Sequence, residues 1–298
     1  NTKCVYKLDA EFGMPMWTLG VSTYGFIDEN QIISWFNTKG NWQIGIIDLK
    51  NNNLTELETS FTDLARIGLK AHENNILLGS SSPTSATTIS LYDQNSSSFT
   101  VLEGSKTLSF PVEYISLPET IEVVSENTHP VHAFFYPPTN PAFEAPENTL
   151  PPLIVFTHGG PTSASTTGLN LNIQFWTSRG FSVLDVNYGG SSGYGRDYRS
   201  SLNLKWGIVD VDDCISAASH IVNRGDADPN RLAIRGGSAG GFTALSALTF
   251  RNFFKAGTSQ YGVTDLTGLA NDTHKFESRY LDNLVGPFPE ESETYHQR

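Results

Sequence analysis

The hydrophobic pattern of the first third of the chain is that of short β-strands. Up to about residue 112, short apolar and β-branched runs alternate with turns rich in Asn, Gly and Ser, and no stretch has a convincing helical period. Polar turns at this spacing join neighbouring strands of antiparallel sheets. We therefore expect an all-β region, with strands at residues 32–36, 43–47, 76–78, 88–92 and 99–102.

This β region contains an internal repeat. Residues 46–58 match residues 91–103, and Asp93 lies 45 residues after Asp48 in that match. Each copy reads as a strand, a polar hairpin turn and a second strand. A repeat of this length is typical of a β-propeller blade, and a generic antiparallel meander is the alternative. Because a propeller needs about four to eight blades to close, we expect further blades before this chain begins, with residues 7–12 ending an earlier one.

After about residue 112 the pattern changes to strands alternating with helices. Residues 113–136 read as a β-hairpin, and a proline-rich loop follows. Continuous apolar strands then alternate with amphipathic helices, which indicates a mostly parallel sheet covered on both faces. The predicted strands are 153–157, 181–187, 231–235 and 254–261, and the predicted helices are 169–179, 209–223 and 239–250.

One turn in this second region carries a candidate nucleophile. Ser238 lies between a predicted strand and a predicted helix, within a Gly-x-Ser-x-Gly turn formed with Gly236 and Gly240. Such a turn strains the serine backbone and exposes its hydroxyl, while side chains at either glycine would collide with the adjacent strand or helix. The helix N-terminus behind the serine offers free N–H groups and a positive dipole end to a developing oxyanion. The sequence therefore predicts the nucleophile elbow of an α/β-hydrolase fold.

A second motif follows the first predicted strand of that sheet. Residues 158–161 read His-Gly-Gly-Pro, and a Gly-Gly loop at the carboxyl end of a strand can turn backbone N–H groups towards a substrate oxygen. A second N–H would come from Ala239, the residue after the nucleophile. His158 is a candidate general base, but in this fold the base follows the nucleophile in the chain. We expect His158 to hold the loop through hydrogen bonds instead.

Charge and cysteine content exclude some classes of function. The 298-residue chain has a formal net charge of -12, which argues against nucleic-acid binding because that needs basic surfaces. No apolar run approaches the ~18 residues of a membrane span. Two distant cysteines, Cys4 and Cys214, favour a reducing compartment, and Cys214 lies in an apolar helical pattern typical of a buried thiol. We expect a cytoplasmic protein that binds neither nucleic acid nor membrane.

Three acidic residues, Asp210, Asp212 and Asp213, crowd the start of a predicted helix. Metal binding is one explanation for such a cluster. Capping and complementarity to the helix dipole explain acidic residues at a helix N-terminus without a ligand. We therefore expect no metal and no cofactor.

The second region contains four motifs in a fixed order: residues 158–161, 187–195 (Asn-Tyr-Gly-Gly-Ser-Ser-Gly-Tyr-Gly), 206–213 (Trp-Gly-Ile-Val-Asp-Val-Asp-Asp) and 236–241 (Gly-Gly-Ser-Ala-Gly-Gly). In this order and at these spacings, they resemble the prolyl oligopeptidase family of serine peptidases. The greatest similarity is to its acylaminoacyl-peptidase and dipeptidyl-aminopeptidase-like branch, in which a propeller precedes the hydrolase domain. The resemblance covers nearly the whole chain and implies peptide substrates screened by the propeller. It also implies Ser238 as nucleophile and the backbone N–H groups of Gly160 and Ala239 as oxyanion donors.

The chain departs from this family where the catalytic acid and base should follow. The candidates after Ser238 are Asp265, His274 and His296. Asp265 and His274 satisfy the order Ser, Asp, His, but they follow the strand directly after the elbow helix, one strand too early for the family acid. We expect Asp265 to bind loop backbone, and the acid and base to lie beyond Arg298.

The expected organisation is therefore two incomplete domains. Residues 1–112 form the last blades of a β-propeller, and residues 113–298 form an α/β-hydrolase domain, doubly wound and mostly parallel, without its acid and base loops. We expect this segment, truncated at both ends, to be inactive and aggregation-prone by itself, because it exposes sheet edges and apolar surface.

The leading hypothesis is a serine exopeptidase or oligopeptidase that forms an acyl-enzyme on Ser238. A carboxylesterase on the same fold is the first alternative, and the blade repeat argues against it. A non-catalytic propeller scaffold with a relic hydrolase domain is the second, and the intact elbow argues against that. The sequence leaves the preferred residue at the scissile bond and the oligomeric state open, a homo-oligomer included.

Overall fold

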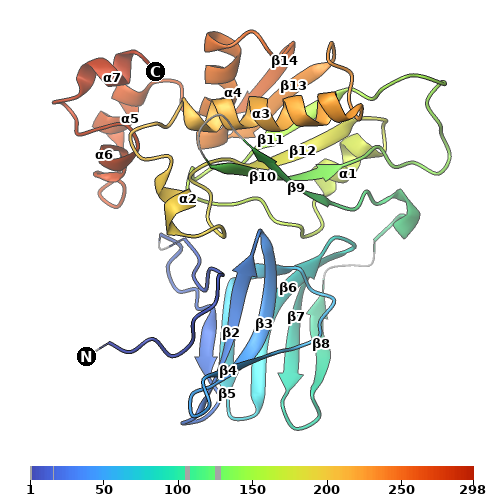
Figure 1. The fold of residues 1–298 in the computed structure, drawn as a ribbon, viewed down its shortest axis with the longest axis vertical. Helices are drawn as coiled ribbons and strands as arrows, with labels where there is room; N and C mark the ends of the chain where they lie inside the picture. The colour runs from blue at the N-terminus through green and yellow to red at the C-terminus, as the bar shows by residue number, and fades with distance from the viewer. Residues whose placement is uncertain (1, 16, 105–107, 125–128) are drawn as a thin grey trace. The chain divides into compact units, whose positions relative to one another are not determined.

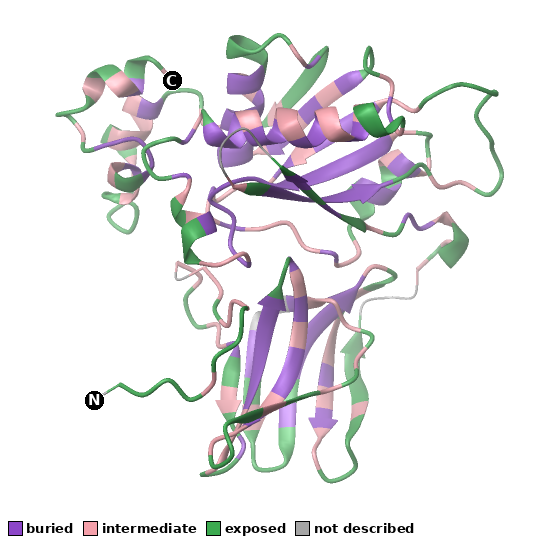
Figure 2. Cartoon of the chain, in the orientation of Figure 1, coloured by how far each residue is buried: buried purple, intermediate pink, exposed green. Residues whose placement is uncertain are grey.

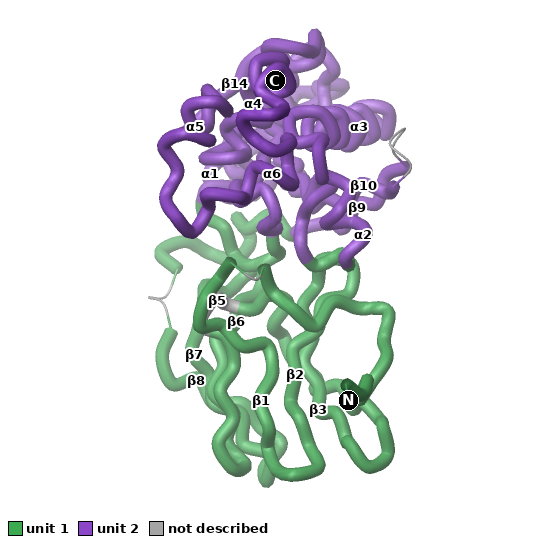
Figure 3. The backbone as a smooth tube through the Cα atoms, turned by 90° about the vertical axis from the view of Figure 1, so that its left-hand side faces the viewer, with its two compact units in different colours: residues 1–117, 166–171, 193–195 green, residues 118–165, 172–192, 196–298 purple. Residues whose placement is uncertain are grey.

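The computed structural model describes residues 2–15, 17–104, 108–124 and 129–298, with the backbone alone at 65–67. The chain divides into two compact units (Figure 3). Whereas the sequence pattern changes at about residue 112, the first unit runs on to Leu117 and takes in two later segments. One of these segments is held by Leu169, whose N–H donates to the carbonyl of Ser82 at 2.9 Å. Unit 1 comprises Asn1–Leu117, Thr166–Leu171 and Gly193–Gly195, and unit 2 comprises Pro118–Ser165, Asn172–Ser192 and Arg196–Arg298.

Unit 1 consists of two four-stranded antiparallel sheets, each with its strands in sequence order. This is the form of a propeller blade, so the propeller-like part of the predicted fold is confirmed. Apolar side chains of both sheets, among them Trp35, Ile44, Leu69 and Leu78, meet in one buried cluster. The strands are β1 (Tyr24–Phe26), β2 (Gln31–Thr38), β3 (Asn41–Asp48), β4 (Asn53–Glu56), β5 (Asp63–His72), β6 (Asn75–Ser82), β7 (Ser85–Asp93) and β8 (Ser98–Gly104).

The internal repeat is confirmed at the level of single hydrogen bonds. β3 ends at Asp48 and β7 ends at Asp93. Asp48 Oδ1 accepts the N–H groups of Lys50 at 2.8 Å and Asn51 at 3.0 Å, and Asp93 Oδ1 accepts that of Asn95 at 2.9 Å. The backbone bond from Asn51 is the largest cause of the lowered pKa of Asp48. Each aspartate thus closes the polar turn to the next strand in the same way.

Unit 2 is built on one six-stranded sheet with the order β14-β13-β11-β12-β10-β9 (Figure 1). The first four of these strands are parallel, and β10 and β9 join antiparallel at one edge. The predicted doubly wound, mostly parallel sheet is therefore confirmed. The turn of the β9–β10 hairpin, at 125–128, lies outside the described residues. The strands are β9 (Glu119–Val124), β10 (Pro130–Tyr136), β11 (Leu153–Thr157), β12 (Ser182–Asn187), β13 (Leu232–Gly237) and β14 (Ala256–Gln260).

Helices cover both faces of this sheet, and its central strands are buried (Figure 2). Successive residues of β10 show the two faces: Ala133 and Phe135 pack in the cluster that contains α3 and α4, whereas Phe134 packs with Ile173 of α1. Three short helices, α5 to α7, follow β14. The helices are α1 (Leu171–Thr177), α2 (Arg196–Ser200), α3 (Val209–Arg224), α4 (Ala239–Phe250), α5 (Leu266–Asp272), α6 (Tyr280–Leu284) and α7 (Ser292–His296), with a 3-10 turn at Val112–Tyr114.

The two cysteines are both free thiols. Cys214 is fully buried on α3, as its apolar pattern predicts, and Cys4 is exposed. Burial raises the pKa of the Cys214 thiol well above its usual range, which keeps it protonated and unreactive. Within the described ranges, no helix has both the length and the apolar character needed to cross a bilayer.

Candidate active site

Ser238 occupies the sharp turn between β13 and α4. Its backbone has φ 54° and ψ -122°, a conformation that costs a non-glycine residue about 1–3 kcal/mol. Its N–H donates to the carbonyl of Gln260 at 3.0 Å, and its carbonyl accepts the N–H of Val263 at 3.4 Å. Ser238 is exposed although Gly236, Ala239 and Gly240 around it are buried. The turn therefore presents the hydroxyl at the surface while the rest of the elbow is packed.

The elbow glycines are required by the backbone packed against them. A Cβ on Gly240 would overlap the carbonyl oxygen of Thr157 and lie 2.7 Å from that of His158. A Cβ on Gly236 would overlap Thr157 Oγ1 and the carbonyl of Gly240. Thr157 Oγ1 donates to that same Gly240 carbonyl at 2.8 Å. The end of β11 and the elbow are thus in direct backbone contact, as we expected from the glycine spacing.

The His-Gly-Gly-Pro loop leaves β11 beside the nucleophile. A Cβ on Gly159 would lie 3.2 Å from the carbonyl of Gly237 and 3.5 Å from Ser238 Cβ. Gly160 has φ +121°, a conformation that L side chains rarely adopt. Of the described residues, none accepts a hydrogen bond from the N–H of Gly160 or of Ala239. Both residues line one pocket with Ser238, so two backbone donors without protein partners border the candidate nucleophile.

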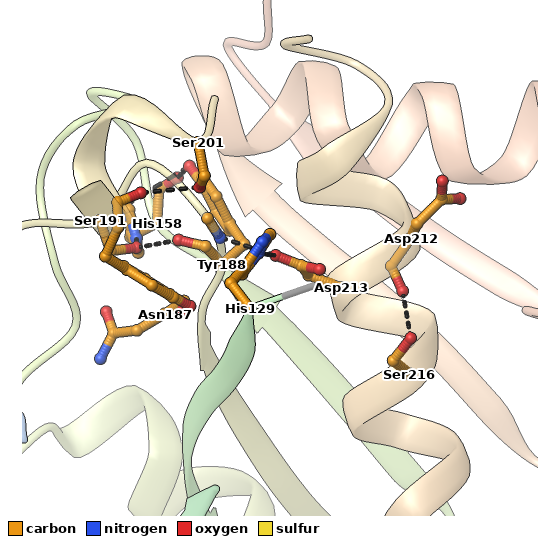
Figure 4. Close-up of polar contacts among 11 residues, drawn as sticks. His129, His158, Asn187, Tyr188, Ser191, Ser201, Asp212, Asp213 and Ser216 are labelled. Atoms are coloured by element: carbon orange, nitrogen blue, oxygen red, sulfur yellow. Dashed lines mark hydrogen bonds and ion pairs between the residues drawn. The ribbon is translucent and has the colours of Figure 1, made fainter. Parts of the chain in front are cut away.

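His158 makes its contacts within its own loop and with the loop that follows β12 (Figure 4). Its ring stacks on Tyr188 with centroids 4.4 Å apart, and its Nε2 lies 2.7 Å from Ser191 Oγ. Its Nδ1 lies 2.9 Å from the carbonyl oxygen of Gly159. Burial lowers the pKa of His158 to about 4, so the ring is neutral at pH 7. The expectation that His158 holds the loop through hydrogen bonds is confirmed.

The contact between His158 and Gly159 has a consequence for Gly160. The carbonyl of Gly159 and the N–H of Gly160 belong to one planar peptide group, in which they point in opposite directions. Fixing the carbonyl with His158 Nδ1 therefore fixes the direction of the Gly160 N–H.

The acid and base candidates after the elbow have other partners. Asp265 Oδ1 accepts the N–H of Gly268 at 3.0 Å, so it binds backbone, but this backbone is the first turn of α5 and not a loop as expected. His274 is exposed and lies 3.6 Å from a carboxylate oxygen of Glu277. No side chain in the described part of the chain hydrogen-bonds to Ser238 Oγ. The structure therefore does not bring Asp265 and His274 together as a catalytic pair.

The three acidic residues at the start of α3 each bind a different segment of unit 2. The helix N-cap is Ile208, and no side chain caps it, so the expectation of capping is wrong. Asp210 and Asp212 do lie in the first turn, where a negative charge complements the helix dipole as expected. The acidic residues are also used in tertiary contacts, which a helical pattern does not show. Asp210 accepts hydrogen bonds from the Gly207 N–H (2.6 Å) and from Thr243 Oγ1 (2.5 Å). Asp212 forms an ion pair with Arg251 (2.9 Å). Asp213 accepts a hydrogen bond from the Gly189 N–H (2.8 Å) and lies 2.9 Å from His129 Nε2 (Figure 4).

Asp185 on β12, a buried acid like Asp210 and Asp213, makes the stability of the protein depend on pH. Burial raises its pKa to about 7, although Ser165 Oγ donates to it at 2.5 Å. The unfolded chain ionises this carboxyl at about pH 4, whereas the folded chain keeps it protonated to about pH 7. The folded state therefore loses stability as pH rises through that window, by an amount on the order of 4 kcal/mol.

The variant Asp185→Asn removes this titration. We expect the free energy of unfolding of the variant to increase relative to that of the parent protein between pH 4 and pH 7, and the difference to level off above pH 7. Denaturant unfolding of both proteins across this range measures it, and the other titrating groups cancel in the difference. Parallel curves for the two proteins would show that Asp185 is not protonated in the folded state.

The pocket beside Ser238 has a volume of about 90 Å³ and is lined by both apolar and polar residues. The ring of Tyr280 lies in its wall, and the Tyr280 hydroxyl donates to the carbonyl of Gly160 at 2.7 Å. The sequence did not indicate this tyrosine, because it begins a five-residue helix without a helical period of its own. The remaining lining residues are Gly160, Pro161, Trp206, Ala239, Val263, Leu269, Thr273, Glu277 and Leu281.

Comparison with known proteins connects this site to one family. The profile of the prolyl oligopeptidase family matches residues 167–298. The acylamino-acid-releasing enzyme of Arabidopsis thaliana is 31% identical over 210 residues, which are 66% of this chain and 27% of that enzyme. Dipeptidyl aminopeptidase BIII of Pseudoxanthomonas mexicana is 33% identical over 45% of this chain and 20% of its own length.

Solved structures extend the similarity to almost the whole chain. A puromycin-hydrolyzing peptidase of Mycobacterium tuberculosis superposes with a TM-score of 0.95 at 40% identity, covering 99% of this chain. A puromycin hydrolase gives a TM-score of 0.94 at 37% identity. The chain spans 45% of the first of these structures. Sequence profile, relatives and fold agree, and the chain belongs to the prolyl oligopeptidase family of serine peptidases.

Proposed function

We propose that the protein hydrolyses short peptides through an acyl-enzyme on Ser238. The observation that carries this proposal is the geometry of one pocket. It combines an exposed serine in a strained turn with two backbone N–H groups, from Gly160 and Ala239, that have no acceptor among the described residues. A nucleophile beside two unsatisfied donors is what acyl transfer requires.

In the proposed reaction, Ser238 Oγ attacks the carbonyl carbon of the scissile bond and gives up its proton to a base. The carbonyl oxygen becomes an oxyanion, which accepts hydrogen bonds from the N–H groups of Gly160 and Ala239. When this intermediate collapses, the C–N bond breaks and the amine leaves with a proton. Water then attacks the acyl-enzyme by the same route and releases Ser238. Each N–H donor in such a site contributes about 10²–10³-fold to the rate.

The base and its acid partner belong to the full-length protein in this proposal. Without a base, a serine hydroxyl is a weak nucleophile at neutral pH. His158 is excluded as the base because both of its ring nitrogens contact other groups and its pKa is about 4. We propose that residues outside this chain supply the acid and the base, since the chain spans under half of the relatives that it matches.

The walls of the pocket favour an apolar side chain next to the scissile bond. Trp206, Val263 and Leu281 offer apolar surface close to Ser238, and burying a methylene group contributes about 0.8 kcal/mol. The names of the relatives describe release of acylamino acids, dipeptidyl aminopeptidase activity and hydrolysis of puromycin. We propose a peptidase that prefers an apolar residue on the acyl side of the bond.

A substrate panel tests this function on the full-length protein. Aminoacyl anilides with apolar, acidic and basic side chains, their N-acetylated forms and short acyl esters are compared by kcat/KM. We expect hydrolysis of anilides, with apolar residues favoured about tenfold or more. Ester cleavage without any amide cleavage would support a carboxylesterase instead. No turnover of the whole panel would support a non-catalytic scaffold.

A further inference from the structure

Tyr280 is bound to the loop that carries one of the two proposed oxyanion donors. Its hydroxyl donates to the carbonyl of Gly160 at 2.7 Å and lies 3.0 Å from Thr162 Oγ1. Gly160 and Tyr280 lie 120 residues apart in the chain. The bond therefore joins two distant segments at the wall of the Ser238 pocket.

The helix of Tyr280 is fixed to the helix of the nucleophile. Leu281 and Leu284 of α6 are buried in the same cluster as Ala239 and Phe242 of α4. Because Ala239 carries the second N–H donor, α6 keeps its position relative to that donor through apolar packing. The hydroxyl of Tyr280 continues this connection to the loop of the first donor.

The loop itself needs such a restraint. The N–H and the carbonyl of Gly160 belong to two successive peptide groups, which turn against each other about the φ and ψ angles of Gly160. A glycine leaves both angles unusually free. His158 holds the first peptide group through the Gly159 carbonyl, and Tyr280 holds the second through the Gly160 carbonyl. Together they fix the backbone conformation of Gly160 on both sides of its Cα.

We propose that Tyr280 is a positioning residue for the oxyanion site: its hydroxyl holds the Gly160 carbonyl so that the Gly160 N–H remains directed at the reacting oxygen. This inference rests on the proposed function. Burial raises the pKa of Tyr280 above its usual value, so the hydroxyl keeps the proton that it donates. Tyr280 acts on the reaction through Gly160 and is not itself a donor to the substrate oxygen.

The variant Tyr280→Phe removes the hydroxyl and keeps the ring in the pocket wall. Tyr295→Phe is a matched control, because the Tyr295 hydroxyl donates to the carbonyl of Gly286, also at 2.7 Å. Tyr295 is buried in the same cluster as α6 but does not line the pocket. Both variants lose a bond from a tyrosine hydroxyl to a glycine carbonyl, and Tyr280→Phe also loses the contact with Thr162 Oγ1. Only the bonds of Tyr280 reach the oxyanion loop.

In the full-length protein we expect Tyr280→Phe to lower kcat on a peptide anilide about 10- to 100-fold, with KM changed less than about twofold. The affinity of a peptidyl trifluoromethyl ketone, which binds as an oxyanion-like adduct, should weaken by a similar factor. Tyr295→Phe should keep kcat within about twofold of the parent enzyme. These readouts separate loss of oxyanion stabilisation from loss of packing.

Three results would overturn the assignment: kcat of Tyr280→Phe within twofold of an active parent enzyme, a loss confined to KM, or an equal loss of kcat in Tyr295→Phe. An unchanged kcat would show that Tyr280 has no role in the reaction. A loss confined to KM would show that Tyr280 contacts the substrate. An equal loss in Tyr295→Phe would show that the effect is one of general stability. An inactive parent enzyme would instead overturn the proposed function, and the role of Tyr280 with it.

Discussion

Replacing Ser238 by alanine will reduce peptide hydrolysis by the full-length protein about 10⁴-fold or more. The variant retains the pocket and the two backbone donors but has no atom that can form the acyl bond. Its free energy of unfolding should stay close to that of the parent protein, because the hydroxyl makes no hydrogen bond among the described residues and alanine keeps the same Cβ in the same strained turn. Steady-state kinetics with an apolar aminoacyl anilide measure the loss.

Ser216→Ala is the control for this substitution. Ser216 lies on α3 and donates its hydroxyl to the carbonyl of Asp212 at 2.9 Å, a local helix bond outside the pocket (Figure 4). We expect its kcat/KM to equal that of the parent enzyme within about twofold. If Ser238→Ala keeps more than a tenth of the activity, another residue forms the covalent bond and the elbow is not the catalytic centre.

Replacing Gly240 by alanine will both destabilise the protein and abolish its activity. The new Cβ overlaps the carbonyl oxygen of Thr157 and lies 2.7 Å from that of His158. Both obstacles are backbone atoms at the end of β11, so no rotation of a side chain relieves the overlap. We expect a loss of about 3 kcal/mol or more in the free energy of unfolding and a fall of about 10 °C in Tm.

Activity should fall more than stability alone explains, because the displaced atoms belong to the elbow and to the loop of Gly160. Gly13→Ala is the control, since a Cβ at Gly13 has no atom within 4 Å. The Tm of thermal unfolding and the kcat at 25 °C are measured for both variants and compared with those of the parent protein. If the Gly240→Ala protein has the same Tm and the same kcat as the parent protein, the close contact between β11 and the elbow is contradicted.

Two elements of unit 2 that are apolar along most of their length can be predicted from the sequence alone with the correct bounds. The helix expected at 239–250 and the strand expected at 153–157 have the same bounds in the structure. Both are apolar along most of their length and end at clear turn signals. The blade repeat is also confirmed, because the aspartate of each turn makes a local hydrogen bond that depends only on neighbouring residues.

The sequence was less informative wherever tertiary contacts decide the structure. Helices α5 to α7 have five to seven residues each, which is too short for a helix to form without packing. No hydrophobic period in the sequence predicts them. The bond of Tyr280 to Gly160 crosses 120 residues and has no local signal. For Asp210, Asp212 and Asp213 the sequence indicates only capping and complementarity to the helix dipole, because partners such as Thr243 and Gly189 are distant in the chain.

The most direct test of the account is covalent labelling of the full-length protein with a fluorophosphonate. Trypsin cuts after Arg235 and Arg251, so one peptide, residues 236–251, carries both Ser238 and the buried Ser246. We expect a single phosphonate adduct in that peptide, located on Ser238 by fragmentation and absent from Ser238→Ala. An adduct on a different serine, or no adduct at all, would contradict the assignment of Ser238 as an activated nucleophile.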